Sequence, residues 1–288
     1  MSATMGRIRA ALFPRASSGI PVGVFVIIVA ALVLIAIFAP LLAPEAPNSQ
    51  NLMGRLKAPG TEVRGVFYIL GSDELGRDLL SRLIYGARVS LSVAFLSVLL
   101  SGCVGTVLGM AAGYMRGWTE TIIMRLVDVF LSIPAILLAI ITVAVLGPGF
   151  INVILVLALT RWPRYARVAY GQTLTVSSMP YVRLARAMGA RWPRVLLLHI
   201  LPNIMAAMAV VATLEFGLMV LFEAGLSFLG LGVQPPTASW GAMLSVGRNY
   251  VTNAWWIATF PGICLFLLVL SVNLIGDRLS EYLNPKSR

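Results

Sequence analysis

Charge is scarce in this chain of 288 residues, of which 11% are charged, whereas a soluble domain carries about 25%. The apolar fraction is 59% and the mean hydropathy is +0.90. So apolar a surface is incompatible with water, which excludes a soluble enzyme, a secreted disulfide scaffold and a disordered tail. The composition predicts an all-α integral membrane protein, because a helix satisfies its own backbone hydrogen bonds within lipid.

Reactive side chains are scarce as well. His199 is the one histidine, and Cys103 and Cys264 lie singly in apolar runs, where cysteine is mostly a small buried hydrophobe. This inventory supplies no metal site. The lysines are Lys57 and Lys286, and no G-x-x-x-x-G-K-[ST] motif is present, so the chain does not bind a nucleoside triphosphate through a P-loop. We expect no catalytic residue, no metal and no cofactor in this chain.

Arginine supplies nearly all of the positive charge. Lys and Arg number 22 against 11 Asp and Glu, a formal net charge of +11. In a soluble protein this excess would suggest nucleic acid. In a chain this apolar, the expected partners are instead anionic membrane lipids and cytoplasmic proteins, and no nucleic acid.

Six apolar runs predict six transmembrane helices. Most are long enough for the roughly 20 residues that a crossing helix needs. The first, Ile20–Ala43, is longer than the ~7–15 apolar residues of a signal peptide, so a retained helix is favoured over a cleaved leader. The second contains glycines at the spacing that lets helices approach closely: Gly102, Gly105, Gly109 and Gly113. The runs are Ile20–Ala43, Val89–Gly113, Ile122–Leu146, Phe150–Tyr170, Asn203–Gly225 and Trp256–Gly276.

The fourth run decides the orientation. Its apolar stretch, Phe150–Thr160, is too short to cross alone, and a re-entrant segment is the rival interpretation. If it did not cross, the basic loop that follows would lie outside, against the positive-inside rule. We therefore predict six spans with both termini cytoplasmic. The six tryptophans lie at or beyond the predicted span ends, which is typical of an aromatic belt.

The chain divides accordingly into a cytoplasmic tail (1–20), a first span (21–43), an external loop (44–87), a five-helix core (88–276) and a cytoplasmic tail (277–288). The last part of the external loop, Asp73–Ala87, predicts an amphipathic helix at the outer surface. Its charged residues, Asp73, Arg77, Asp78 and Arg82, could meet an external binding protein, but pairing with one another at i, i+4 is favoured.

The most informative segment is Pro180–Asn203, PYVRLARAMGARWPRVLLLHILPN. It predicts two short helices, with Gly189 permitting a sharp bend and Pro193 starting the second helix. A basic loop solvated against anionic lipid would explain it without a partner. Glycine and proline at helix boundaries favour a docking element instead.

This segment resembles the EAA loop of ABC-importer permeases: E-A-A, three residues, G, nine residues, I-x-L-P. Ala185, Gly189, Leu201 and Pro202 match it, while Arg183 replaces the glutamate and His199 the isoleucine. Further segments resemble the dipeptide and oligopeptide branch, among them GSDELGRDLLSRLIYGARVSL (71–91), GYMRGWTETIIMRLVDVFLSIPAILLA (113–139), EAGLSFLGLGVQPPTASWGAML (223–244) and FPGICLFLLVLSVNLIGDRLSEYLNPK (260–286). The likeness covers about residues 22–286 and identifies a C-type permease of a peptide/nickel importer.

The resemblance implies a type I ABC importer permease fold and a location in the bacterial cytoplasmic (inner) membrane. It implies a non-catalytic subunit that forms half of a path for short peptides, with nickel complexes, glutathione and opines as related cargoes. The implied partners are a homologous second permease, two ATPases that bind ATP and Mg, and an extracytoplasmic solute-binding protein. The implied ATPase-coupling residues lie in loop 177–203: Tyr181, Arg183, Ala185, Arg186, Gly189, Arg191, Arg194, His199, Leu201 and Pro202.

Charged residues inside the spans are costly and need a partner or a cavity. Arg125 and Asp128 are three apart and predict a structural ion pair. Two interpretations of Glu215 are equally supported: it contacts the cationic end of a peptide in the translocation path, or it forms a hydrogen bond across the bundle. The bundle role is favoured for Glu223. Asn152 and Asn273 are weaker path candidates.

Two other classes compete with the importer subunit. A six-span secondary transporter or channel without an ATPase would need ionisable or broken-helix sites near the midplane, and it would leave the basic segment unused. An intramembrane protease would depend on His199 as its base, and this residue lies beside a cytoplasmic turn.

Overall fold

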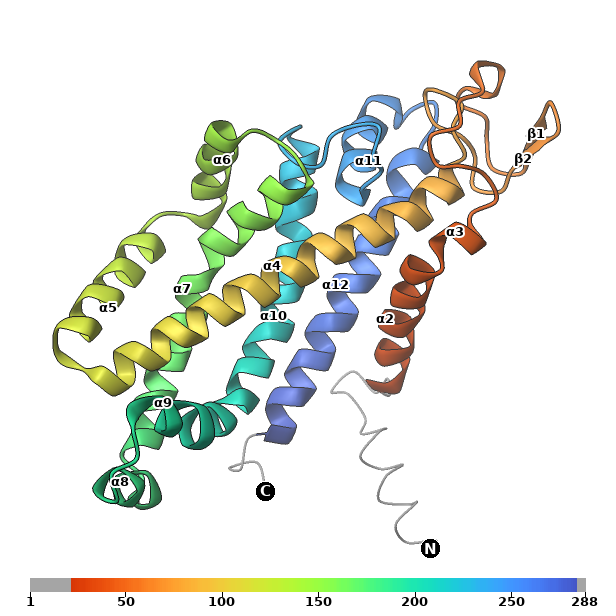
Figure 1. The fold of residues 1–288 in the computed structure, drawn as a ribbon. Coiled ribbons are helices and arrows are strands. Elements are labelled where there is room, and N and C mark those ends of the chain that lie inside the picture. Colours follow the sequence, from red (N-terminus) through yellow and green to blue (C-terminus); the bar gives the residue numbers. More distant parts are fainter. Residues whose placement is uncertain (1–21, 284–288) are drawn as a thin grey trace, which may run out of the picture.

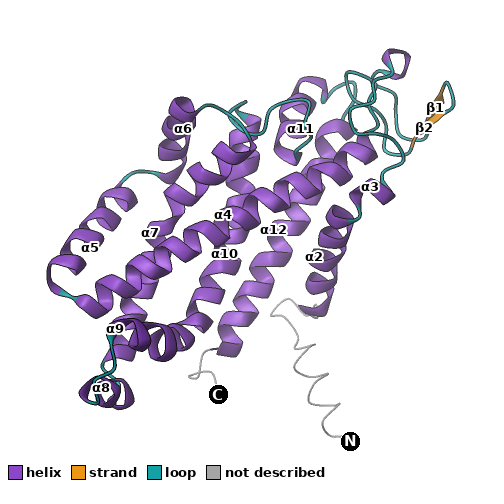
Figure 2. Cartoon of the chain, viewed as in Figure 1, coloured by secondary structure: helices purple, strands orange, loops and turns teal. Residues whose placement is uncertain are grey.

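Helices make up most of the described chain. The computed structural model describes residues 22–283 (Figure 1), and Figure 2 shows helix nearly throughout, with one small hairpin of strands at one end. The N-terminal tail (1–20) and the last residues of the C-terminal tail (284–288) lie outside the described residues. The elements are α2 (Val22–Ile37), α3 (Ala39–Leu42), η1 (Leu52–Gly54), β1 (Thr61–Val63), β2 (Val66–Tyr68), α4 (Leu79–Met115), α5 (Gly117–Ser132), α6 (Ala135–Leu146), α7 (Phe150–Ser177), α8 (Pro180–Ala187), α9 (Trp192–Arg194), η2 (Val195–Ile200), α10 (Leu201–Phe228), α11 (Trp240–Gly247), η3 (Arg248–Tyr250) and α12 (Trp256–Leu283).

The long helices form a bundle with two distinct ends. Three stretches of the described chain are long and apolar enough to cross a membrane, namely Leu79–Met115, Trp192–Phe228 and Trp256–Leu283, and the α5–α6 pair would be a fourth. In Figure 1 the β-hairpin lies at one end of the bundle and α8 at the other, here called the hairpin end and the α8 end. The chain is therefore a helical protein that crosses the membrane more than once.

The predicted third span is not one straight helix. The run Ile122–Leu146 is divided into α5 and α6, which meet at 94°. Proline at position 134 has no N–H to continue the helix and disfavours helical backbone at the residue before it. Ile133 is accordingly extended, with φ −94° and ψ 130°. The prediction of one straight helix was wrong because the apolar residues continue without interruption on both sides of the break.

The disputed fourth segment is one unbroken helix. α7 runs for 28 residues through its arginines, with Pro163 in its interior. At 1.5 Å per residue it is roughly 42 Å long, so the segment is long enough to cross and does not fold back as a re-entrant loop. The first predicted span is interrupted near its C-terminal end: within the described residues α2 ends at Ile37 and is followed, after Phe38, by the four-residue α3.

The glycine stripe of α4 lies against α7, as the spacing predicted. A Cβ atom added at Gly105 would lie 2.4 Å from the carbonyl oxygen of Trp162, and one at Gly109 would lie 2.4 Å from that of Ala166. At Gly113 the added atom would lie 2.8 Å from Thr173. Each value is shorter than real Cβ contacts, so the two backbones approach too closely for any side chain other than hydrogen.

The hairpin end is a compact polar cap. Asp73 pairs with Arg77 at 2.6 Å and with Arg82 at 3.4 Å, and all three side chains are buried. The favoured i, i+4 pairing is thus confirmed for Asp73 and Arg77. Tyr68 donates a hydrogen bond to the carbonyl oxygen of Gly76 at 3.0 Å, and burial raises the pKa of this phenol. The cap therefore joins the hairpin to the start of α4.

Two expectations for this end need correction. Residues 73–87 do not form a separate amphipathic helix, because Asp78 caps the N-terminus of α4 by accepting from the backbone N–H of Ser81, and α4 continues from there without a break. The tryptophans do not all form a belt at the lipid interface. Trp240 and Trp256 are buried and donate hydrogen bonds to the carbonyl oxygens of Leu83 and Ser72, 3.0 Å each.

Replacing Gly105 with alanine should destabilise the bundle. The new methyl group would overlap the backbone of α7, and overpacking of this kind costs about 1–3 kcal/mol. The matched control is Gly171→Ala on α7, where nothing lies within 4 Å of the added atom. The control should be neutral or slightly stabilising because alanine favours helix. Thermal unfolding in detergent, followed by the monodisperse fraction, measures both, and equal midpoints would contradict the proposed close contact.

Replacing Asp73 with asparagine should loosen the cap. The change leaves Arg82 buried without its carboxylate, and breaking a buried ion pair costs about 3–5 kcal/mol. Glu62→Gln on the exposed hairpin strand β1 is the control and should change little. Limited proteolysis between α3 and α4 reports the loosening, and a cleavage rate equal to that of the control would argue against the ion-pair cluster as the support of the cap.

Candidate functional site

The basic segment predicted to dock a partner is ordered by a buried anchor. Val182 on α8 is fully buried and packs into a small apolar cluster with Val195, Ile200 and Ile204. Tyr181 contacts His199 edge to face, with ring centroids 6.4 Å apart, and the guanidinium of Arg186 lies 4.9 Å from the ring centroid of Tyr114. In Figure 1, α8 extends beyond the ends of the long helices. The segment is thus a defined structure that projects from the bundle.

Gly189 ends α8 through its backbone, as predicted. Its φ is +86°, the left-handed conformation that glycine adopts without cost. The N–H of Ala190 donates to the carbonyl of Ala185 at 3.0 Å, and the N–H of Gly189 donates to that of Arg186 at 2.9 Å. This pair of bonds is the Schellman arrangement that closes a helix. Ala185 and Gly189, two of the positions that match the EAA pattern, therefore fix where α8 ends.

The second half of the segment is helical up to α10 and includes a π-helical turn, η2. Pro202, in the first turn of α10, has no N–H to donate to the preceding turn, and a proline there loosens the regular hydrogen-bond pattern. The side-chain amide of Asn203 donates instead to the carbonyl of His199 at 2.6 Å. Leu201 and Pro202 thus mark a change of helix geometry, and α9, η2 and α10 form one continuous helical stretch.

The outward face of this segment is both apolar and basic. Tyr181, Leu184 and Met188 recur at helical spacing and are exposed, Leu184 by 61% and Met188 by 80%. The arginines of the segment are exposed too: Arg183, Arg186, Arg191 and Arg194. Exposed apolar residues among basic ones are typical of an interaction surface. We call the surface formed by Tyr181, Arg183, Leu184, Met188 and Arg191 the α8 face.

A second group of charges lies in the middle of the bundle. Glu215 of α10 is 2% exposed and pairs with Arg164 of α7 at 3.1 Å and with Arg161 at 3.7 Å. The guanidinium of Arg161 also lies 4.1 Å from the ring centroid of Phe222. The carboxylate therefore joins α7 to α10 and has two cationic partners. The side chain of Arg161 is buried, whereas that of Arg164 is 56% exposed.

The predicted ion pair between Arg125 and Asp128 is not the one that forms. Asp128 of α5 pairs with Arg167 of α7. On the same helix pair, the hydroxyl of Tyr170 donates to the carboxylate of Glu120. An acid on one helix finds its partner on the neighbouring helix, which spacing along a single helix cannot reveal.

The remaining polar candidates serve the bundle. Glu223 is fully buried and accepts hydrogen bonds from the hydroxyls of Ser90 at 2.9 Å and Ser227 at 2.8 Å, so the favoured role of a bond across the bundle is confirmed. The amide of Asn152 donates to the carbonyls of Leu146 and Gly147 at the α6–α7 turn. These contacts account for both side chains structurally.

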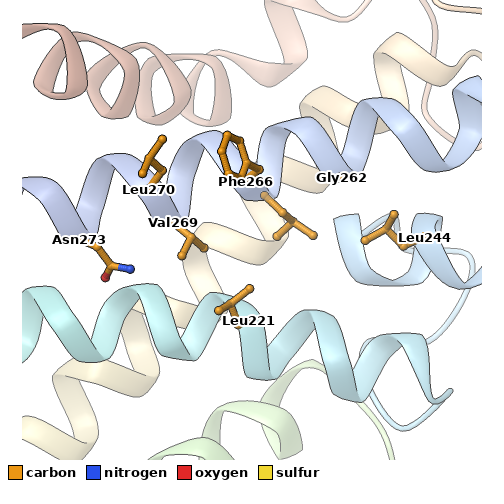
Figure 3. A pocket seen from close by; sticks show the side chains of 8 residues that line it. Leu221, Leu244, Gly262, Phe266, Val269, Leu270 and Asn273 are labelled. Atoms are coloured by element: carbon orange, nitrogen blue, oxygen red, sulfur yellow. The ribbon is translucent and has the colours of Figure 1, made fainter. Parts of the chain in front are cut away.

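Asn273 lies in an apolar groove. The groove has a volume of about 480 Å³ and runs along α10, α11 and α12. Figure 3 shows the amide of Asn273 directed toward α10, with Leu221, Val269 and Phe266 further along the groove. The backbone of Gly217 lies close by, since a Cβ added there would be 2.9 Å from the amide oxygen.

Arg161, Arg164 and Arg167 lie within the fourth predicted run, 150–170, where the sequence alone indicates no acidic partner for them. The structure brings their acids from α5 and α10, which are remote in the sequence. The signal that could have identified the network was the pair of isolated acids, Asp128 and Glu215, within otherwise apolar runs. An acid inside a span needs a polar or cationic partner, and the arginines of α7 are candidates for that partner.

Comparison with known proteins agrees with this architecture. A family model described as the binding-protein-dependent transport system inner membrane component matches residues 105–288, and one described as the N-terminal TM domain of oligopeptide transport permease C matches residues 23–59. The di/tripeptide transport system permease protein DppC of Pseudomonas aeruginosa (strain UCBPP-PA14) is 44% identical over 259 residues, covering 88% of this chain and 84% of that protein. The glutathione transport system permease protein GsiD of Pectobacterium atrosepticum (strain SCRI 1043) is 40% identical over 274 residues, covering 95% and 89%.

Solved structures share the fold at lower sequence identity. An inward-facing structure of the MetNI methionine ABC transporter matches with a TM-score of 0.57 and 20% identity, covering 72% of this chain and 98% of that chain. An amino acid ABC transporter matches with a TM-score of 0.53 and 15% identity, covering 71% and 95%. With a family model matching more than half of its length and relatives above 40% identity, the chain belongs to the binding-protein-dependent transport system inner membrane components, the permease subunits of ABC importers.

Proposed function

We propose that this permease imports short peptides and that its α8 face docks on a separate ATPase subunit. The observation that carries the coupling role is the α8 face itself: an exposed apolar and basic surface, held by the buried Val182 and closed by Gly189. The names of relatives support the cargo, since they include transport systems for di/tripeptides, D,D-dipeptides and glutathione. ATP and Mg would be bound by the partner, and this chain would carry out no covalent chemistry.

A protein partner explains the α8 face better than lipid does. An amphipathic helix that binds a membrane lies in the interface plane with its apolar side toward the acyl chains. α8 instead projects past the ends of the long helices, and its exposed Leu184 and Met188 lie among arginines. Leucine and methionine supply apolar area to a protein interface, and arginine pairs with carboxylates there.

The assembly would contain two permeases, two ATPases and an external binding protein. We propose six spans: α2 with α3, α4, α5 with α6, α7, α9 to α10 and α12, with both termini on the cytoplasmic side of a bacterial inner membrane. The basic residues of the α8 segment then obey the positive-inside rule. Transport would alternate between two packing arrangements of these helices, driven by closure of the ATPases.

The translocation path would follow the side of α7 that faces away from α4. Trp162, Ala166 and Thr173 face α4. With 3.6 residues per turn, Arg164, Arg167 and Gly171 lie on the opposite side of the helix, where they are exposed. Glu215 would act here through Arg164, because its own carboxylate is buried. Asn273 is a second polar candidate, in the groove of α10 and α12, whereas the hydrogen bonds of Asn152 favour a structural role.

Replacing Leu184 with aspartate should detach the ATPase. A charge at the centre of an apolar contact costs most of the energy of a docking residue, about 2 kcal/mol or more, so ATPase recovery with the tagged permease should fall at least about tenfold. The control is Phe67→Asp, a similarly exposed apolar residue on β2 at the hairpin end. Affinity purification in mild detergent measures recovery. Loss of the ATPase from both variants, or from neither, would contradict docking at α8.

Cysteine labelling tests the orientation. Glu62→Cys on β1 should react with a membrane-impermeant maleimide in intact spheroplasts, whereas Tyr282→Cys near the end of α12 should react only after permeabilisation. Both variants are made in a chain whose native Cys103 and Cys264 are replaced by serine. Labelling of both positions in intact cells would overturn the even number of spans.

A further inference from the structure

The arginines of α7 form a row at every third residue, positions 161, 164 and 167. Their acids come from neighbouring helices: Glu215 on α10 for the first two and Asp128 on α5 for the third. The row thus lies on the sides of α7 that face α10 and α5. Arg164 is the fifteenth of the 28 residues of α7, near the middle of the helix.

The charges of this cluster do not balance. Arg161 and Arg164 share one carboxylate, which is 2% exposed. One carboxylate compensates one guanidinium, so the group retains one positive charge. Arg161 is buried and lies against Phe222, which leaves Arg164 as the member that presents this charge at the surface.

Arg164 still has donors to offer. A guanidinium carries five N–H groups, and the contact with Glu215 is made through Nη1 at 3.1 Å. The pairing holds the side chain in place while leaving it more than half exposed. An arginine fixed in this way resembles a prepared anion site, because a planar guanidinium binds a carboxylate through two parallel hydrogen bonds.

An unpaired positive charge on Arg164 would be energetically costly within the bundle. Leu214 and Val129, the sequence neighbours of Glu215 and Asp128, are exposed apolar residues. A charged residue at this depth is tolerated where it faces a water-filled path or an opposite charge. A positive site on such a path would favour an anionic group and disfavour a cation.

We propose that Arg164, held by Glu215 and supported by Arg161, binds the terminal carboxylate of the peptide during translocation. This inference rests on the proposed function, and it reverses the polarity first expected for Glu215, whose charge is already compensated within the chain. A carboxylate of the second permease could bind Arg164 through the same hydrogen bonds. The experiment below distinguishes that carboxylate from the one at the C-terminus of the peptide.

The test compares two cargoes in the assembled importer. Proteoliposomes with ATP inside and saturating binding protein outside take up a radiolabelled dipeptide or the same dipeptide with its C-terminus amidated. The acid-to-amide ratio of initial rates is measured for the wild type, Arg164→Gln, Arg164→Lys and the control Arg88→Gln, an exposed arginine on α4. Any preference of the binding protein itself cancels when these ratios are compared between permease variants.

Arg164→Gln should lower the ratio at least about fivefold, because the acid loses charge-assisted hydrogen bonds, whereas the amide loses at most a weaker bond to a neutral acceptor. Arg164→Lys should keep part of the preference, and Arg88→Gln all of it. An acid-to-amide ratio that Arg164→Gln leaves unchanged would overturn the inference. If Arg164 contacts an acid of the second permease instead, the uptake rates of both cargoes should fall equally and the ratio should stay the same. In that outcome the wild type still imports peptide. If the wild type imports neither cargo with ATP, the proposed peptide function itself fails.

Discussion

The close approach of α4 and α7 is the constraint on which the rest of the bundle depends. Helices in lipid gain little from the hydrophobic effect on association, so packing and interhelical hydrogen bonds hold them together. At Gly105 and Gly109 the backbone of α4 lies directly against carbonyl groups of α7, without an intervening side chain. This contact sets the rotation of α7 about its own axis. With Trp162 and Ala166 turned toward α4, the helical repeat places Arg164 and Arg167 on the far side, toward α5 and α10.

Buried acids then fix the neighbours of these two helices, and each uses a different chemistry. Glu223 near the C-terminal end of α10 accepts hydrogen bonds from hydroxyls, which joins α10 to α4 through Ser90. Glu215, two turns earlier on α10, binds guanidinium groups of α7. A hydroxyl satisfies a carboxylate without adding charge, whereas two arginines more than compensate it. The same residue type on one helix therefore builds a neutral tie at one depth and a positively charged site at another.

Local features of this protein were predictable from its sequence. The end of α8 at Gly189 and the pairing of Asp73 with Arg77 depend on residues within a turn or two of one another, and the glycine stripe of α4 is a regular spacing along one helix. The predictions that failed concern features that depend on contacts between remote segments, or on a single residue within a long apolar run. Asp128 pairs with Arg167 on another helix. The sequence does not show that α5 and α7 are neighbours, so this pair could not be predicted from it. The break at Pro134 was concealed because the apolar run continues on both sides. The tryptophans Trp240 and Trp256 lie near span ends but are buried, and each donates a hydrogen bond to a carbonyl group of a remote segment.

The order of elements along the chain connects the two candidate sites. α8 follows α7 directly, and η2 leads without interruption into α10, so the basic segment is the connection between the two helices that Glu215 joins. Val182 couples this connection to both, because its cluster includes Val176 of α7 and Ile204 of α10. Packed interiors transmit displacement because they are dense and have few voids. A force applied to the α8 face would therefore act on α7 and α10 together. A change in the separation of these two helices would alter the ion pair between Arg164 and Glu215. Arg164 is held by that pair, so its exposure depends on the spacing of the same two helices.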